Sequence, residues 1–282
     1  MKVQTWTRRE AIGPKVIDFC GGQLALASFV SPDKETCNED AIAAIELGPE
    51  HGVVIVADGL GGHQAGDQAA SEIVNSIAGA LRKTTAGQSI TGTLVEAVGR
   101  ANQRIMNWGL GAGSTVVVAE ILDRSVQMIH AGDSCGLICS NRARVKFQTV
   151  AHSPVALAVE LGVLSEAEAI THDERNVVSN FVGFSDMKIE VGPEIQLASR
   201  DTVLLATDGL FDNATIEEIV QAIRAGQLES QFEKLITTIR EQMQRACEET
   251  ESNIESSLGK PDDLTVACFR LHSQKKRNEL AT

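Results

Sequence analysis

The sequence predicts an α+β domain in which pairs of helices cover mixed β-sheets. Short apolar runs rich in β-branched residues recur along the chain between turn residues, which is typical of buried strands. Segments with helical spacing come in consecutive pairs rather than alternating singly with strands, and this favours mixed sheets covered by helices. A chain of 282 residues with 43% hydrophobic residues can bury one such core as a single domain.

Three predicted strands stand out because each apolar run ends at an aspartate. They are residues 52–58, 126–133 and 202–208. Weaker apolar runs predict further strands at 24–30, 40–46, 114–121, 134–140 and 264–271. Their β-branched content and the flanking glycines favour strands over helices.

Amphipathic spacing predicts helices at 64–83, 90–108, 215–225 and 228–250. Thr215 and Glu218 form a capping-box pattern that marks the start of the third of these helices. Residues 150–187 combine glycine-rich punctuation with a weak pattern, and we expect irregular structure there.

The composition argues against several classes of function. The 38 acidic and 25 basic residues give a net charge of −13, so the surface repels phosphate backbones and nucleic acid is not an expected partner. The six cysteines lack the spacing of a structural zinc site. The N-terminus lacks an apolar signal region, and no apolar run is long enough to span a membrane. We therefore expect a cytoplasmic protein with reduced cysteines and no membrane association.

Carboxylates gather at the ends of predicted strands. Asp58, Asp133 and Asp208 close apolar runs, and the pairs Glu39–Asp40 and Asp262–Asp263 directly precede them. Carboxylates that meet at one sheet edge repel one another strongly unless cations lie between them. Oxygen ligands without His or Cys select hard ions such as Mg²⁺ or Mn²⁺. A single Asp-Gly after an apolar run is usually a plain turn, so this prediction depends on the sites taken together.

The segment ADGLGGHQAG (57–66) adds backbone groups to the candidate site. Gly59 can present its carbonyl oxygen to a metal, while Gly61 and Gly62 allow the backbone to approach a ligand closely. The predicted helix after Gly66 directs free N–H groups toward this loop, and such a helix end favours an anion such as a phosphoryl group.

Short motifs along the chain resemble those of the protein phosphatase 2C family, the metal-dependent serine/threonine phosphatases, in its bacterial type. In family order they are NEDA (38–41), VADGLGGHQAG (56–66), GSTVVVA (113–119), HAGDSCGL (130–137), RNVVSNFVG (175–183), LLATDGLFDN (204–213) and DDLTV (262–266). The resemblance covers roughly residues 24–271, leaving 1–23 as an N-terminal extension and 272–282 as a mobile tail. It implies a four-layer α/β/β/α sandwich of two mixed β-sheets flanked by helix pairs, with the metals at one end between the sheets.

The resemblance implies that two ions, Mn²⁺ or Mg²⁺, bind to the strand-terminal carboxylates. Asp58 would bridge the two ions, and the carbonyl oxygen of Gly59 would bind one of them. Asp208 and Asp262 would complete the protein ligands of the first ion.

The same resemblance implies roles for the remaining carboxylates. Glu39 and Asp40 would act on the second ion, partly through bound water, and Asp133 would join Asp208 at a third, weaker site. A water or hydroxide between the two metals would be the nucleophile in an in-line attack on phosphorus, so no side chain is assigned as nucleophile.

The chain departs from the family pattern where the substrate phosphate would bind. The position of the family's phosphate-gripping arginine holds Glu35. Lys34 beside it could bind phosphate as a point charge, although it could equally be a solvated loop lysine. Arg175 is a second candidate.

Histidines also depart from the pattern. The position of the general-acid histidine found in some members holds Leu60, so that role cannot be assigned. His63 matches the bacterial GGH pattern without a clear catalytic role. His152 follows Ala151 instead of aspartate, and we expect it to be structural. Residues 154–174 would form the flap that borders the active site.

Three functions remain open at this stage. The first is an active phosphatase acting on phosphorylated proteins, including a cognate Ser/Thr kinase or its substrates. The second is a pseudophosphatase or regulatory binding module with little turnover, and the third is hydrolysis of small phosphorylated molecules. Asp58, Asp208 and Asp262 are all present, which favours the first, because degenerate relatives usually lose their metal ligands first.

Overall fold

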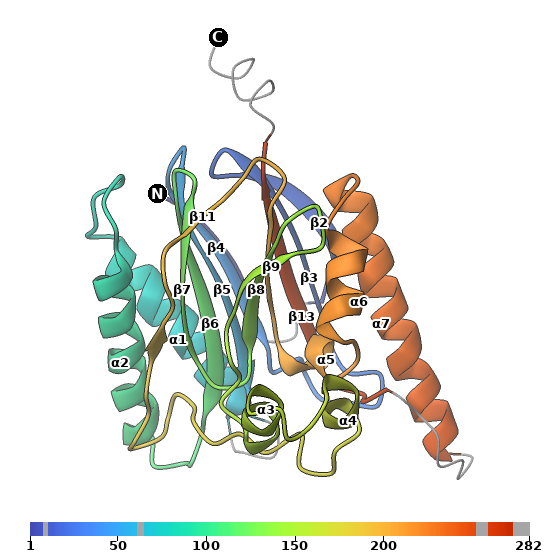
Figure 1. Cartoon of the computed structure of the whole chain (residues 1–282). Helices are drawn as coiled ribbons and strands as arrows, with labels where there is room; N and C mark the ends of the chain where they lie inside the picture. The colour runs from blue at the N-terminus through green and yellow to red at the C-terminus, as the bar shows by residue number, and fades with distance from the viewer. Residues whose placement is uncertain (8–10, 61–64, 252–258, 273–282) are drawn as a thin grey trace.

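A computed structural model describes residues 1–7, 11–60, 65–251 and 259–272. Two β-sheets pack face to face, and a pair of helices covers the outer face of each (Figure 1). The helices are α1 (Gly66–Leu81) and α2 (Thr91–Asn107) on the first sheet, and α6 (Ile216–Ile223) and α7 (Leu228–Glu251) on the second. The α+β class and the four layers are as predicted.

The two sheets divide the strands between them. The first contains, in spatial order, β1 (Lys2–Thr7), β4 (Ala41–Gly48), β5 (His51–Gly59), β6 (Ser114–Leu122), β7 (Ser125–Ala131) and β10 (Glu190–Val191), with β11 (Ile195–Gln196) also paired to β7. The second contains β2 (Ile12–Phe19), β3 (Gly22–Phe29), β13 (Leu264–Leu271), β12 (Thr202–Ala206), β8 (Cys135–Cys139) and β9 (Val145–Gln148).

In one respect the prediction is corrected, because both sheets are antiparallel rather than mixed. Every pairing between the strands of the described segments runs antiparallel. The helix pairs explain this arrangement. A single helix after a strand would return the chain to the start of that strand, so the next strand would be parallel. Two consecutive helices bring the chain back to the end of that strand, so the next strand is antiparallel. Gly59 at the end of β5 accordingly pairs with Ser114 at the start of β6.

The core lies in three layers, one between the sheets and one beneath each helix pair. Strand β5 shows how one apolar strand contributes side chains to two of these core layers. Val53 and Ile55 pack toward the helices, and Val54 and Val56 pack toward the other sheet. Side chains alternate along a strand, so a strand buried on both faces appears as the unbroken apolar run seen in the sequence.

Residues 1–23, expected to be an extension, contribute β1 and β2 as outermost strands of the two sheets. The region 150–187 is mainly irregular and contains the short helices α3 (Pro154–Glu160) and α4 (Glu166–Ile170). The tail expected over 272–282 lies almost entirely outside the described residues. Among the helices that the structure describes, none is long and apolar enough to cross a bilayer.

Candidate metal centre

Strand periodicity carries two carboxylates into the space between the sheets. In β5, Val54 and Val56 face the second sheet, and Asp58 continues on that face at the end of the strand. Asp40 directly precedes β4, whose Ile42 faces the same way. Because β4 and β5 are antiparallel and in register at this end, Asp40 and Asp58 lie side by side.

The second sheet brings its carboxylates to the same end of the sandwich. The end of β12 pairs with the starts of both β8 and β13. Asp133 lies in the turn before β8, and Asp262 lies just before β13. Asp208 was expected to close a strand, but β12 ends at Ala206 and Asp208 is the first residue of the short helix α5 (Asp208–Phe211). The structure therefore brings the predicted carboxylates together from both sheets.

Asp263 fixes the loop that carries Glu39 and Asp40. Its Oδ1 accepts a hydrogen bond from the Ser31 N–H at 2.8 Å, and its Oδ2 accepts one from the Glu39 N–H at 2.8 Å. The Thr207 hydroxyl donates to Asp40 Oδ2 at 3.1 Å, which joins this loop to the end of β12. Asp263 thus positions the loop, because both oxygens of its carboxylate accept hydrogen bonds from backbone N–H groups.

The electrostatics of the cluster favour bound cations. Burial raises the pKa of Asp58 well above its usual value, and the charges of Asp40 and Asp208 add to this effect. Burial also raises the pKa of Asp40 well above its usual value, with the charge of Asp263 as the next cause. For Asp133, burial and the charge of Asp208 raise the pKa to about 8. A divalent ion among these groups would offset the cost of holding them ionised.

Unpartnered oxygens show that the residues fit such an ion. Oδ1 of Asp40 and Oδ1 of Asp133 are buried and have no hydrogen-bond partner among the described residues. Buried carboxylate oxygens are costly without a partner, and a hard cation is one that suits them. Gly59 is required on steric grounds, because a Cβ there would lie 2.4 Å from the backbone of Gly66.

Two lysines lie within the cluster. The Nζ atom of Lys34 is 2.8 Å from Glu39 Oε2 and 3.0 Å from Asp263 Oδ2, so the residue expected to hold substrate phosphate is paired with carboxylates. Sequence reasoning missed Lys260, whose ammonium lies within 2.9 Å of three aspartates, namely Asp208, Asp212 and Asp262.

Asp212 was also missed, although a sequence signal existed. It follows Asp208 at helical spacing in the segment DGLFD, so one helical turn places both on the same side. Burial and the charge of Asp208 raise the pKa of Asp212 to about 6, although Lys260 opposes the shift. The contact between Asp212 and Lys260 joins residues that are distant in the sequence, so no short sequence pattern predicts it.

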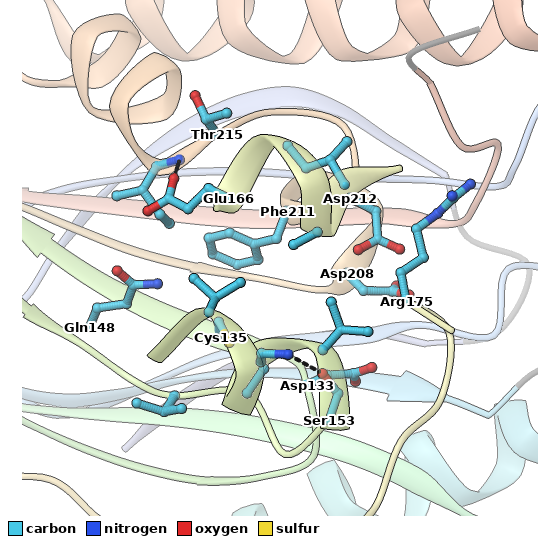
Figure 2. A pocket seen from close by; sticks show the side chains of 18 of the residues that line it. Asp133, Cys135, Gln148, Ser153, Glu166, Arg175, Asp208, Phe211, Asp212 and Thr215 are labelled. Atoms are coloured by element: carbon cyan, nitrogen blue, oxygen red, sulfur yellow. Dashed lines mark hydrogen bonds between the residues drawn. The ribbon is translucent and has the colours of Figure 1, made fainter. Parts of the chain in front are cut away.

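A cavity of about 330 Å³ opens beside the carboxylates (Figure 2). Asp133, Asp208 and Asp212 line one part of it, and Phe211 and apolar residues of α3 and α4 line another. Arg175 also lines the cavity, and Figure 2 shows its side chain beside Asp208 and Asp212. Its buried Nε atom has no hydrogen-bond partner among the residues that the structure describes. The cavity is therefore lined by carboxylates and by the side chain of one arginine.

A second cluster is held together by hydrogen bonds. Potential ligand atoms of His130, His152 and Glu190 lie within 4.8 Å of one another. However, Nδ1 of His152 accepts hydrogen bonds from the Gly132 N–H at 3.0 Å and from Asn180 Nδ2 at 2.7 Å. The proton of His152 is therefore on Nε2, which lies 3.2 Å from Glu190 Oε1. This is the bonding expected of a structural histidine.

Gly61, Gly62 and His63 lie outside the described residues. Leu60 is described, and its N–H donates to the Gly113 carbonyl oxygen at 3.1 Å, next to the start of β6.

Comparison with known proteins agrees with the fold and identifies the family. The family described as stage II sporulation protein E (SpoIIE) matches residues 48–272. A serine/threonine phosphatase Stp from Listeria innocua is 31% identical over 200 residues, which is 66% of this chain and 79% of that protein.

Solved structures share the architecture. The serine/threonine phosphatase of S. agalactiae superimposes with a TM-score of 0.73 at 23% identity, covering 89% of this chain and all of that one. The catalytic domain of the phosphatase PstP, solved in complex with two manganese ions, gives a TM-score of 0.66 at 21% identity, covering 89% and 98% of the two chains. With the carboxylates of both sheets gathered at one end of the same sandwich, this chain belongs to the protein phosphatase 2C family of metal-dependent serine/threonine phosphatases.

Proposed function

We propose that this protein hydrolyses phosphoserine and phosphothreonine in other proteins at a centre that holds two divalent metal ions. The observation that carries the proposal is the pair of buried, unpartnered oxygens on Asp40 and Asp133. They belong to one carboxylate cluster, of which Asp133, Asp208 and Asp212 line the cavity. The named activity of the Listeria innocua relative supports the same substrate class.

We assign the metal ligands as the resemblance implies. Asp58 and the Gly59 carbonyl would hold ions together with Asp208 and Asp262, and the other carboxylates, Glu39, Asp40 and Asp133, would complete the set. The manganese ions of the PstP structure support Mn²⁺ as one cofactor, and the hard oxygen donors suit Mg²⁺ equally well. Bound there, the ions would lower the pKa of a water molecule and offset the charge of the phosphoryl group.

The chain's own residues position the substrate. Arg175 lines the cavity, and its guanidinium group would suit a phosphoryl oxygen. Lys34 is the alternative phosphate-binding group, although its ammonium is already shared between Glu39 and Asp263. Helices α3 and α4 border the cavity and would contact the polypeptide around the phosphorylated residue.

The substrates would be proteins phosphorylated by a Ser/Thr kinase, and they could include the kinase itself. A reducing, cytoplasmic location is consistent with the cysteines, which form no disulfide among the described residues. The catalytically inactive binding module is less well supported, because the carboxylates proposed as metal ligands are present and lie near one another.

The test is a phosphatase assay with p-nitrophenyl phosphate, a phosphothreonine peptide and a panel of phosphorylated metabolites, each with and without Mn²⁺. We expect Mn²⁺-dependent turnover of the first two, with the peptide preferred to every metabolite. A preference for a metabolite would replace the protein substrate with a small one. No turnover of any substrate in Mn²⁺ or Mg²⁺ would support the binding module instead.

A further inference from the structure

The cavity beside the carboxylate cluster has an apolar part that the proposed metal chemistry does not use. Asp133, Asp208 and Asp212 line the polar part. Apolar side chains from α3 and α4, and from the segment between α5 and the start of α6, line another part, namely Val155, Val159, Ile170, Phe211, Ala214 and Ile216. Of these, Val159, Ile170 and Phe211 are only half-buried, so apolar surface remains accessible to a ligand. A ligand with its phosphoryl group at the carboxylates would have this surface beside it.

Hydrogen bonds hold the walls of this apolar part in place. The Ser153 hydroxyl oxygen accepts from the Ala156 N–H at 3.0 Å and caps the start of α3. Ser165 caps α4 in a capping box. Glu166, the first residue of α4, accepts from the Ile216 N–H at 3.2 Å, which joins α4 to the start of α6 (Figure 2). The walls are therefore preformed, and a preformed pocket loses less conformational freedom when it binds a ligand.

Apolar side chains are also exposed on α3 and in the turn that follows it. Leu157 is 55% exposed, Leu161 69% and Val163 72%. The last two are the most exposed large apolar side chains among the described residues. Because Val155 and Val159 of the same helix line the cavity, α3 offers apolar groups both inside the cavity and outside it. Exposed apolar clusters commonly mark binding surfaces, so this region favours an apolar partner segment.

The charges around the cavity disfavour an acidic partner segment. Glu160 and Glu166 line the cavity in addition to the three aspartates, and the whole chain has a net charge of −13. An acidic side chain beside a phosphorylated residue would meet like charges here. An aliphatic side chain would instead meet the accessible apolar surface of Val159, Ile170 and Phe211.

We propose that the apolar part of the cavity is a specificity subsite, which takes an aliphatic side chain close in sequence to the phosphorylated residue of the substrate protein. This inference rests on the proposed phosphatase function and names a class of substrate for the same site. Burial of that side chain against Val159, Ile170 and Phe211 would contribute to binding through the hydrophobic effect. Phosphorylated segments with such a neighbour would be preferred to segments with a small or acidic one.

The test compares phosphothreonine peptides that differ at a single position. Leucine, alanine, glutamate or lysine is placed in turn at each position that flanks the phosphothreonine, and kcat/KM is measured with Mn²⁺ on the full chain. The readout is the ratio of kcat/KM for the best leucine peptide to that for the matching alanine peptide. A general loss of catalysis lowers both values and leaves this ratio unchanged.

Two variants shorten the apolar wall, Val159→Ala and Ile170→Ala. Val145→Ala is the matched control, because Val145 is 39% exposed in β9 and does not line the cavity. We expect a ratio of about ten in wild type and in Val145→Ala, and of about three in the two wall variants. If circular dichroism shows that a wall variant does not fold, Ile170→Val replaces it, with an expected ratio between these two values.

A wild-type ratio near one would overturn the proposal, and so would a ratio that the wall variants leave at its wild-type value. A preference for the lysine peptides would also overturn it, because Glu160 and Glu166 would then recognise the substrate. If no peptide is turned over, the proposed function fails. The Kd values of the leucine and alanine peptides, measured by fluorescence anisotropy with Mn²⁺, then give the corresponding ratio and test the subsite independently.

Discussion

The imidazole of His152 accepts a hydrogen bond from the backbone N–H of Gly132, at 3.0 Å, one residue before Asp133. Gly132 has a φ of 113°, a conformation that side chains rarely adopt, and a Cβ there would lie 2.4 Å from Thr115 Cβ. The histidine therefore fixes the backbone next to Asp133, which belongs to the carboxylate cluster. This contact gives a specific role to a residue that the sequence analysis expected to be structural.

Replacing His152 should therefore impair catalysis through the position of Asp133. We expect His152→Ala to lower kcat about tenfold while KM for p-nitrophenyl phosphate changes little, because substrate contacts are kept. His172→Ala, a second histidine from the same irregular region, is the control. The idea fails if steady-state kinetics of the two variants coincide, or if Mn²⁺ affinity of His152→Ala is unchanged along with kcat.

Removing a proposed metal ligand should be far more damaging. Asp208→Asn and Asp262→Asn each take a negative charge from a centre that stabilises the transition state, so we expect turnover to fall by on the order of 100-fold or more. The exposed Asp186→Asn should retain wild-type kinetics. Circular dichroism must show native folding in all three, and near-normal kinetics in either centre variant would mean that the site has been misplaced.

Phosphate binding should depend more on Arg175 than on Lys34. Arg175 lines the cavity, whereas Lys34 is already paired with Glu39 and Asp263. We expect Arg175→Ala to raise KM for p-nitrophenyl phosphate several-fold and Lys34→Ala to raise it less. The reverse order would assign phosphate binding to Lys34.

The loop around Lys34 also allows a test of whether an arginine at position 35 would bind the substrate phosphate. Glu35→Arg removes a negative charge near the cluster and adds a guanidinium, so it should lower KM more than it changes kcat. An unchanged KM in Glu35→Arg would show that this loop does not reach the phosphate.

Stability without metal should depend on pH through Asp133. Its pKa is raised from 3.8 to about 8, so folding favours the protonated form. A raised pKa gives stability that is complete below the unfolded value and is lost as pH rises toward the folded value. The metal-free protein should therefore have a lower Tm at about pH 8 than at about pH 5. Asp133→Asn should reduce this difference in Tm.

Adding Mn²⁺ should reverse this trend. The ion favours ionised carboxylates, so the gain in Tm should grow with pH, and calorimetry in buffers of different ionisation enthalpy should show proton release at neutral pH. Activity should require Mn²⁺ or Mg²⁺ absolutely. Turnover that persists after exhaustive treatment with EDTA would contradict the assigned centre.

The predictable parts of the molecule were those encoded locally. The unbroken apolar run before Asp58 identified a strand buried on both faces, and its alternation is what brings that aspartate between the sheets. The capping box at Thr215 was confirmed, with Thr215 Oγ1 accepting from the Glu218 N–H and the Glu218 carboxylate accepting from the Thr215 N–H. In such cases a few adjacent residues contain the whole physical signal.

Other parts could not be predicted because their cause is distant in the sequence. Strands β1 and β2 are only partly buried and carry a weak pattern, so their pairing with β4 and β3 decides their structure. The contact of Lys260 with Asp208 and Asp212 exists only once β12 and β13 are adjacent. Asp208 itself was predicted as the end of a strand, but β12 ends two residues earlier, at Ala206, and α5 begins at Asp208.

The gathering of ligands from both sheets has a mechanical consequence. Asp40 and Asp58 extend strands of the first sheet, while Asp208 and Asp262 flank strands of the second. An ion bound by carboxylates of both sheets would link the two sheets at this end of the sandwich. The sheets could then not separate there without releasing the ion. Metal at 100-fold its Kd would add about 2.7 kcal/mol to the free energy of unfolding. The backbone amides of β5 and β12 would then exchange with solvent at a common, slower rate, as parts of one cooperative unit.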